Sequence, residues 1–214
     1  MTDNKTASSL HTITLGMGCY WSPEALFGAM PGIIRTRVGF AGGTTDEPSY
    51  RDMGDHTETV ELTFDPAAVS YDELLETFWN NHKPMNINGY KDRQYQSLLL
   101  YRDEAQEKAF RRIKSRLEGG KESLDTELSP FRSFYPAESR HQKYYLKRFP
   151  DAVAKLSAIY PSEEELQNAT LAARLNGVAK GFLSVERLQG EMKQWALSPD
   201  ELSEMLALVR SIRW

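Results

Sequence analysis

The chain has 214 residues, of which 40% are hydrophobic and 26% charged, a composition that favours a buried core over a disordered chain. Asp and Glu number 30 against 26 Lys and Arg, and the formal net charge of −4 argues against nucleic-acid binding through a basic field. The single cysteine, Cys19, excludes an internal disulfide and favours a reducing compartment. No apolar run approaches the roughly 20 residues of a membrane span, and the polar start lacks a signal peptide, so we expect a cytoplasmic protein without a membrane partner.

Periodicity in the first third of the chain predicts strands and one short helix. Residues 11–19 alternate apolar and polar side chains, as in a half-buried strand, and Cys19 ends the core-facing row. Ser22, Pro23 and Glu24 suit the cap, the first position and the positive dipole end of a helix. The prediction is a strand over 11–19, a helix over 22–30, strands over 33–40 and 58–64, and a loop over 44–55.

The middle of the chain continues with helices and strands in irregular alternation. Ser70 and Glu73 match a capping box, which opens a helix ending near Asn81. The pattern then predicts a loop over 80–91, a strand over 94–101, a helix over 103–117, a weaker strand near Thr126 and a helix over 137–148. Because this order lacks the uniform rhythm of a doubly wound sheet, the predicted fold class is α+β.

The character of the chain changes after Pro150. Ser162 and Ser198 each open a further capping box, and no strand pattern follows. An apolar stripe at helical spacing is formed by Val185, Leu188, Met192 and Trp195. We therefore predict one domain over residues 1–150 and an α-helical C-terminal extension over 151–214, with structural packing as its main expected role.

Cys19 has an environment that suits either packing or chemistry. A free cysteine is most often a small buried hydrophobe. Gly16 and Gly18, however, permit close approach of a ligand, and the following helix N-terminus is expected to lower the thiol pKa. Tyr20 and Trp21 supply aromatic faces that suit an apolar or sulfur-bearing ligand. These residues alone leave both interpretations open.

Nine segments carry a resemblance to a known family. The first, Gly-Cys-Tyr-Trp-Ser-Pro-Glu at 18–24, is similar to the Gly-Cys-Phe-Trp signature of A-type peptide methionine sulfoxide reductases. The other segments follow in the family's order at 31–32, 37–43, 50–52, 54–58, 64–66, 78–82, 94–97 and 134–138. The resemblance covers roughly the first 150 residues. It implies a two-layer sandwich in which helices pack on a ferredoxin-like mixed sheet.

The resemblance also implies an activity. Family members reduce methionine-S-sulfoxide, free or in oxidised proteins, as a repair reaction, and leave a cysteine sulfenic acid that a thiol reduces again. Cys19 corresponds to the nucleophile and Glu58 to the proton donor. Glu58 shares a strand face with core residues, so desolvation is expected to raise its pKa as that role requires. Tyr50 and Tyr95 correspond to the two hydroxyls that polarise the sulfoxide oxygen.

The remaining matches and the departures concern binding and recycling. Tyr20, in place of the family's Phe, and Trp21 are expected to hold the S-methyl group. Asp92 stands closer to Tyr95 than the family's substrate-holding Asp, so that role is not assigned to it. Many members resolve the sulfenic acid with further cysteines, whereas this chain has only Cys19. We expect an external thiol instead, either glutathione, glutaredoxin or thioredoxin, and no bound cofactor.

Two other functions are compatible with parts of this pattern. A protein of the same fold could bind oxidised methionine or sense peroxide through Cys19 without turnover. A cysteine hydrolase would need a histidine base, for which His56 is the best-placed candidate. The four histidines lack paired ligand spacing, so no metal site is predicted.

Overall fold

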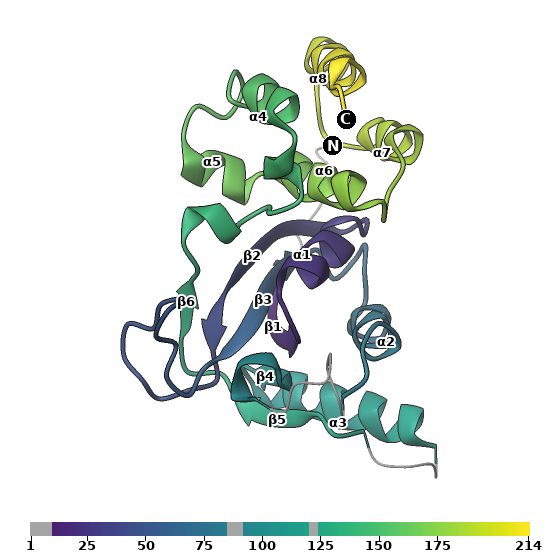
Figure 1. Cartoon of the computed structure of the whole chain (residues 1–214). Helices are drawn as coiled ribbons and strands as arrows, with labels where there is room; N and C mark the ends of the chain where they lie inside the picture. The colour runs from purple at the N-terminus through teal and green to yellow at the C-terminus, as the bar shows by residue number, and fades with distance from the viewer. Residues whose placement is uncertain (1–9, 85–91, 120–123) are drawn as a thin grey trace, which may run out of the picture.

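The computed structural model describes residues 10–84, 92–119 and 124–214, and it shows an α+β fold built on one mixed sheet (Figure 1). The six strands lie in the order β5-β4-β1-β3-β2-β6, antiparallel except for the β4–β5 pair. Their bounds are β1 His11–Met17, β2 Ile33–Ala41, β3 Thr57–Phe64, β4 Ser97–Tyr101, β5 Glu127–Pro130 and β6 Phe134–Pro136. The predicted strands are confirmed, although β1 ends before Cys19 and the start of the predicted 94–101 strand is a 3-10 turn, η1 (Arg93–Tyr95).

Three helices bury the apolar face of the sheet. They are α1 (Trp21–Gly28), α2 (Tyr71–Asn80) and α3 (Glu104–Glu118). Strand residues such as Leu15 and Val60 share one core with Phe27 of α1, Phe78 of α2 and Phe110 of α3. The capping box predicted for α2 is confirmed, since Ser70 and Glu73 bond reciprocally. Most of the loop predicted over 80–91 lies outside the described residues.

The helix that follows Cys19 begins earlier than predicted. Its first residue is Trp21 and its N-cap is Tyr20, which makes no side-chain cap hydrogen bond, so Ser22 is not the cap. The start of the helix is held instead by a residue far away in the sequence, because the Tyr20 backbone N–H donates to the Glu58 carboxylate at 3.1 Å. Glu24 is also more than a dipole partner: its buried carboxylate accepts bonds from the Lys143 backbone and ammonium at 2.8 and 2.7 Å.

The helix predicted over 137–148 is wrong. That segment contains only the 3-10 turns η2 (Ser139–His141) and η3 (Leu146–Arg148). Between them Lys143 has a φ of 52°, which ends any right-handed helix. The Gln142 side chain bonds both backbone groups of Val38, so tertiary contacts to β2 and α1 hold the segment in place of helical hydrogen bonds.

The chain beyond Pro150 is helical. It forms α4 (Pro150–Leu156), α5 (Glu163–Asn168), α6 (Thr170–Lys180), α7 (Val185–Met192) and α8 (Pro199–Ser211). The capping boxes at Ser162 and Ser198 are confirmed, and Leu188 and Met192 of the predicted stripe are fully buried in a second core. None of the described helices is long and apolar enough to cross a membrane.

Helix α1 lies between the sheet and these later helices (Figure 1). Its contact with α6 is close because glycines face the partner: a Cβ at Gly28 would come within 2.6 Å of the Ala173 carbonyl oxygen. Arg174 of α6 is buried and donates to the Gly28 carbonyl at 2.8 Å while it pairs with Glu191 of α7. The helix that carries Cys19 at its start is therefore held from both sides.

Candidate active site

Cys19 lies in the turn between β1 and α1, half-buried after Gly18. Gly18 has a φ of 88°, which the turn requires and which a side chain would resist. Desolvation and the nearby Glu58 carboxylate raise the pKa of the Cys19 thiol to about 11, against a smaller lowering by the Trp21 backbone. The backbone N–H of Trp21 at the start of the helix does lower the thiol pKa, but desolvation outweighs it, so the expectation of a net lowered pKa is wrong. The resting thiol keeps its proton.

Glu58 is the partner of that thiol. Its side chain is 1% exposed at the start of β3, and desolvation raises the pKa of its carboxyl, as the strand pattern predicts. The carboxylate accepts from the Tyr20 backbone N–H at 3.1 Å and from Gln94 Nε2 at 2.8 Å, and its charge raises the pKa of the Cys19 thiol. Its burial and raised pKa are confirmed, and its part in a reaction stays a prediction.

An aromatic cluster adjoins the thiol. Tyr20 is buried against Val38 and Phe40, with Trp21 packed beside it. The Trp21 indole stacks on Tyr144 with ring centroids 3.8 Å apart and planes 4° from parallel. Among the described residues, neither the Tyr20 hydroxyl nor the Trp21 indole N–H has a hydrogen-bond partner, although both are buried. Such groups are suited to receive a polar ligand atom.

Tyr50 joins this cluster through a residue that the sequence did not single out. Tyr50 lies in the 44–55 loop, and its ring centroid is 4.6 Å from that of His141, which also stacks over Trp21 at 5.9 Å. His141 is buried, with neither ring nitrogen hydrogen bonded within the described residues. Burial lowers the His141 pKa and so favours the neutral ring. Sequence analysis missed this placement of His141 and Tyr144 because it predicted a helix over residues 137–148, which the structure does not contain.

Tyr95 is connected to the site through its neighbour in the chain. It ends η1, where its neighbour Gln94 bonds Glu58, so Gln94 is a second residue that sequence analysis missed. Arg93 anchors the turn by donating to the carbonyls of Gly42 and Asp55 at 2.9 and 3.1 Å. Asp92 is exposed and gives no side-chain cap to the turn.

His56, the candidate base of a cysteine hydrolase, uses both of its ring nitrogens in hydrogen bonds to the backbone of a loop. His56 Nδ1 accepts from the Gly43 N–H at 3.1 Å, and Nε2 donates to the Thr45 carbonyl at 2.8 Å. Both nitrogens therefore fasten the 44–55 loop, which argues against a Cys19–His56 pair. No group of three or more His, Cys, Asp or Glu among the described residues is placed to hold a metal ion.

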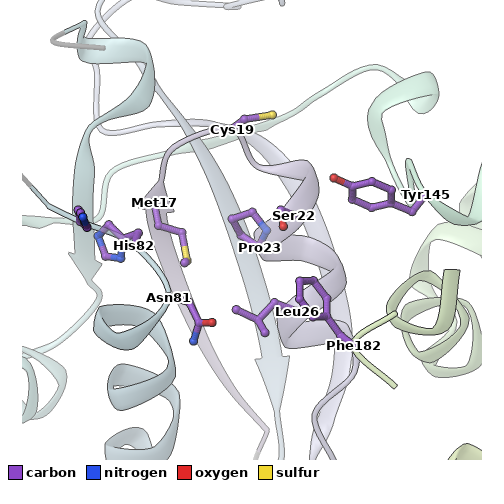
Figure 2. Close-up of a pocket in the computed structure, with 10 residues that line it drawn as sticks. Met17, Cys19, Ser22, Pro23, Leu26, Asn81, His82, Tyr145 and Phe182 are labelled. Atoms are coloured by element: carbon purple, nitrogen blue, oxygen red, sulfur yellow. The ribbon is translucent and has the colours of Figure 1, made fainter. Parts of the chain in front are cut away.

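A cavity of about 440 Å³ opens beside Cys19. Figure 2 shows Cys19 at one end of its wall, with Met17 and His82 on one side and Tyr145 and Phe182 on the other. Glu58 and the aromatic cluster of Tyr20 and Trp21 are not part of this wall as far as the described residues form it. The sulfur thus borders two separate environments.

Comparison with known proteins gives consistent matches. The family described as "Peptide methionine sulfoxide reductase" matches residues 11–174. A peptide methionine sulfoxide reductase of Drosophila melanogaster is 41% identical over 192 residues, covering 89% of this chain and 76% of that protein. One from Methanococcoides burtonii is 38% identical over 144 residues, covering 63% and 94%.

Solved structures agree with these matches. Methionine sulfoxide reductase A of Corynebacterium diphtheriae superposes with a TM-score of 0.56 at 32% identity, covering 70% of this chain and 79% of that one. Reduced Mxr1 from Saccharomyces cerevisiae gives a TM-score of 0.61 at 27% identity, covering 68% and 91%. The Drosophila alignment covers more of this chain than residues 1–150 could supply, so its similarity continues into the later helices.

Proposed function

Because this chain belongs to the peptide methionine sulfoxide reductase family, we propose that its methionine sulfoxide reductase activity uses Cys19 as nucleophile and Glu58 as proton donor on methionine-S-sulfoxide. The observation that carries this proposal is the placement of the buried Glu58 carboxylate, which accepts from the backbone N–H of Tyr20, the residue after Cys19, and whose charge raises the pKa of the thiol, beside an aromatic cluster. The substrates are free methionine sulfoxide and oxidised methionines in proteins.

The Cys19–Glu58 pair holds the one proton that the first step needs. In this step the proton of the Cys19 thiol moves to Glu58 as the sulfoxide enters, and Glu58, whose pKa is raised by desolvation, passes it to the sulfoxide oxygen. The thiolate attacks the sulfoxide sulfur, and the oxygen ends on Cys19 as a sulfenic acid while methionine leaves. The substrate sulfur gains two electrons and Sγ loses two, so the step balances.

The cluster residues supply binding and polarisation in this proposal. Tyr20 and Trp21 form the apolar wall for the S-methyl group, which their rings and their burial with Phe40 support. Tyr50 and Tyr95 donate hydroxyl hydrogens to the sulfoxide oxygen. The contact of Tyr50 with His141, and the place of Tyr95 beside the Gln94–Glu58 bond, support that assignment.

Recycling requires a thiol from outside, because Cys19 is the chain's only cysteine. A reductant thiol attacks the sulfenic acid, forming a mixed disulfide and releasing water, and a second thiol then releases Cys19. Glutathione, glutaredoxin and thioredoxin all provide this chemistry.

We further infer that residues 1–150 form the catalytic domain as a ferredoxin-like two-layer sandwich, with 151–214 as a helical extension. In its support, the central strands lie in the order β4-β1-β3-β2 and are joined in the sequence β1-α1-β2-β3-α2-β4.

The test is a stoichiometric reaction without thiol. One equivalent of an S-sulfoxide peptide should yield one reduced peptide per chain and add one oxygen atom to Cys19, detected by mass spectrometry after trapping with dimedone. Cys19→Ser should yield none, and Glu58→Gln should slow this step by about 10²-fold or more while binding persists. An unchanged rate in Glu58→Gln excludes the acid role. Arrest after one equivalent despite ample dithiothreitol would instead indicate a sensor.

A further inference from the structure

The cavity beside Cys19 gives this residue a second environment, whose described wall is formed by residues other than the proposed sulfoxide groups. Its wall combines Leu26 of α1, the end of α2 at Asn81, Tyr145 and Phe182. Phe182 follows α6, so the later helices contribute directly to the surroundings of Cys19 (Figure 2). None of the residues assigned to the sulfoxide, apart from Cys19, belongs to the described part of this wall.

Two exposed lysines lie at or beside this cavity: Lys83 lines it, and Lys180 contacts the wall residue Tyr145. Lys83 lies in its wall, exposed, and no carboxylate among the described residues forms an ion pair with it. Lys180 is also exposed, and its ammonium lies 4.6 Å from the centroid of the Tyr145 ring on the opposite wall. It too has no acidic partner within the described ranges. Unpaired cations beside a redox sulfur favour an anionic ligand.

We propose that this cavity is the reductant site and that it takes a small peptide thiol with free carboxylates, of the glutathione class; this rests on the proposed function. A volume of about 440 Å³ suits a tripeptide-sized ligand rather than a protein. Lys83 and Lys180 bind its carboxylates, and Tyr145 and Phe182 cover its backbone.

The step at this site balances with the reductant alone. The thiol sulfur of the bound peptide attacks Sγ of the Cys19 sulfenic acid, an S–S bond forms and the S–O bond breaks, and the hydroxyl leaves as water with the thiol proton. A second thiol attacks the peptide sulfur, giving a peptide disulfide and returning the proton to Cys19. Two thiols are oxidised for each sulfoxide reduced.

Steady-state turnover of an S-sulfoxide peptide by the full chain tests this site. The double variant Lys83→Gln/Lys180→Gln should raise the KM for reduced glutathione about 5- to 10-fold relative to that for dithiothreitol, which carries no carboxylate. Glutathione diethyl ester, which lacks both charges, should show no difference between wild type and variant. Lys108→Gln, at an exposed lysine paired with Glu104, is the matched control.

Each other outcome is decisive. Equal changes in KM for glutathione, its ester and dithiothreitol overturn the charge assignment, and an unchanged glutathione KM does the same. Wild-type turnover with thioredoxin but none with millimolar glutathione overturns the choice of a small peptide thiol. Failure of wild type even with dithiothreitol would remove the proposed function itself.

Discussion

The Cys19 thiol is protonated at rest because two local effects act in the same direction. Half-burial removes water that would stabilise a thiolate, and the Glu58 carboxylate adds a negative charge beside it. A thiol of this kind is a poor target for unselective oxidants, since the thiolate is the reactive form. It becomes a nucleophile only when its proton has somewhere to go. The sulfoxide oxygen, reached through Glu58, provides that destination in the proposed reaction.

Alkylation of Cys19 by iodoacetamide measures this coupling, and the single cysteine makes the signal unambiguous. The thiolate reacts, so the rate should rise with pH with an apparent pKa near 11 in the wild type. In Glu58→Gln the carboxylate no longer raises the thiol pKa, and the apparent pKa should fall. Glu104→Gln, at an exposed glutamate, should leave it near 11. The same alkylation curve in Glu58→Gln as in wild type would show that Glu58 does not hold the thiol proton.

At the level of elements, one buried ion pair joins α1 to the irregular segment after β6. Lys143 and Glu24 are both fully buried, and the ammonium also donates to the Thr36 carbonyl at 2.8 Å. Desolvation lowers the Lys143 pKa, which the Glu24 charge opposes. Each charge is tolerated only because the other is present. The pair fixes the segment that carries His141 and Tyr144 against the helix that carries Trp21.

Removal of one partner is therefore expected to cost far more than removal of an exposed charge. Lys143→Met should lower the free energy of unfolding by about 3–5 kcal/mol in urea titrations, because a carboxylate is left buried and unpaired. The double variant Glu24→Gln/Lys143→Met should lose less than the sum of the two single variants. Lys108→Met, which removes an exposed ion pair with Glu104, should change the free energy of unfolding by less than about 1 kcal/mol. Additive single losses would contradict the pairing.

The elements that local sequence governs were predictable. The capping boxes at Ser70, Ser162 and Ser198 each span four residues, and all three open helices in the structure. Alternation located β3, and with it the buried side of Glu58. These signals work because the hydrogen bonds and the periodicity that produce them lie within one element.

The parts that were mispredicted depend on contacts between distant residues. The start of α1 is set by Glu58, 38 positions away, and the 137–148 segment by Glu24 and Val38, more than 100 positions away. No local pattern carries that information. The Cys19 pKa was wrong for the same reason, since desolvation depends on the whole packed environment. Cys19 and Glu58 were identified through family resemblance, whereas His141 entered the site only once the fold was known.

At the scale of the whole molecule, the later helices act on the site through α1. Buried Arg174 connects α7 to the last turn of α1, and Phe182 lies in the cavity beside Cys19.

Two glycine-to-alanine substitutions distinguish the effect of the α1–α6 contact on the active site from a general change in helix stability. Gly28→Ala places a Cβ 2.6 Å from the Ala173 carbonyl oxygen, so α1 and α6 must move apart, and we expect a loss of about 1–3 kcal/mol in urea unfolding together with reduced sulfoxide turnover. Gly190→Ala, in α7, meets nothing within 4 Å and should instead gain about 0.5–1 kcal/mol without changing turnover. If Gly28→Ala lowered stability but left turnover and the Cys19 alkylation rate at wild-type values, the α1–α6 contact would serve packing alone, and the later helices would have no influence on the thiol through α1.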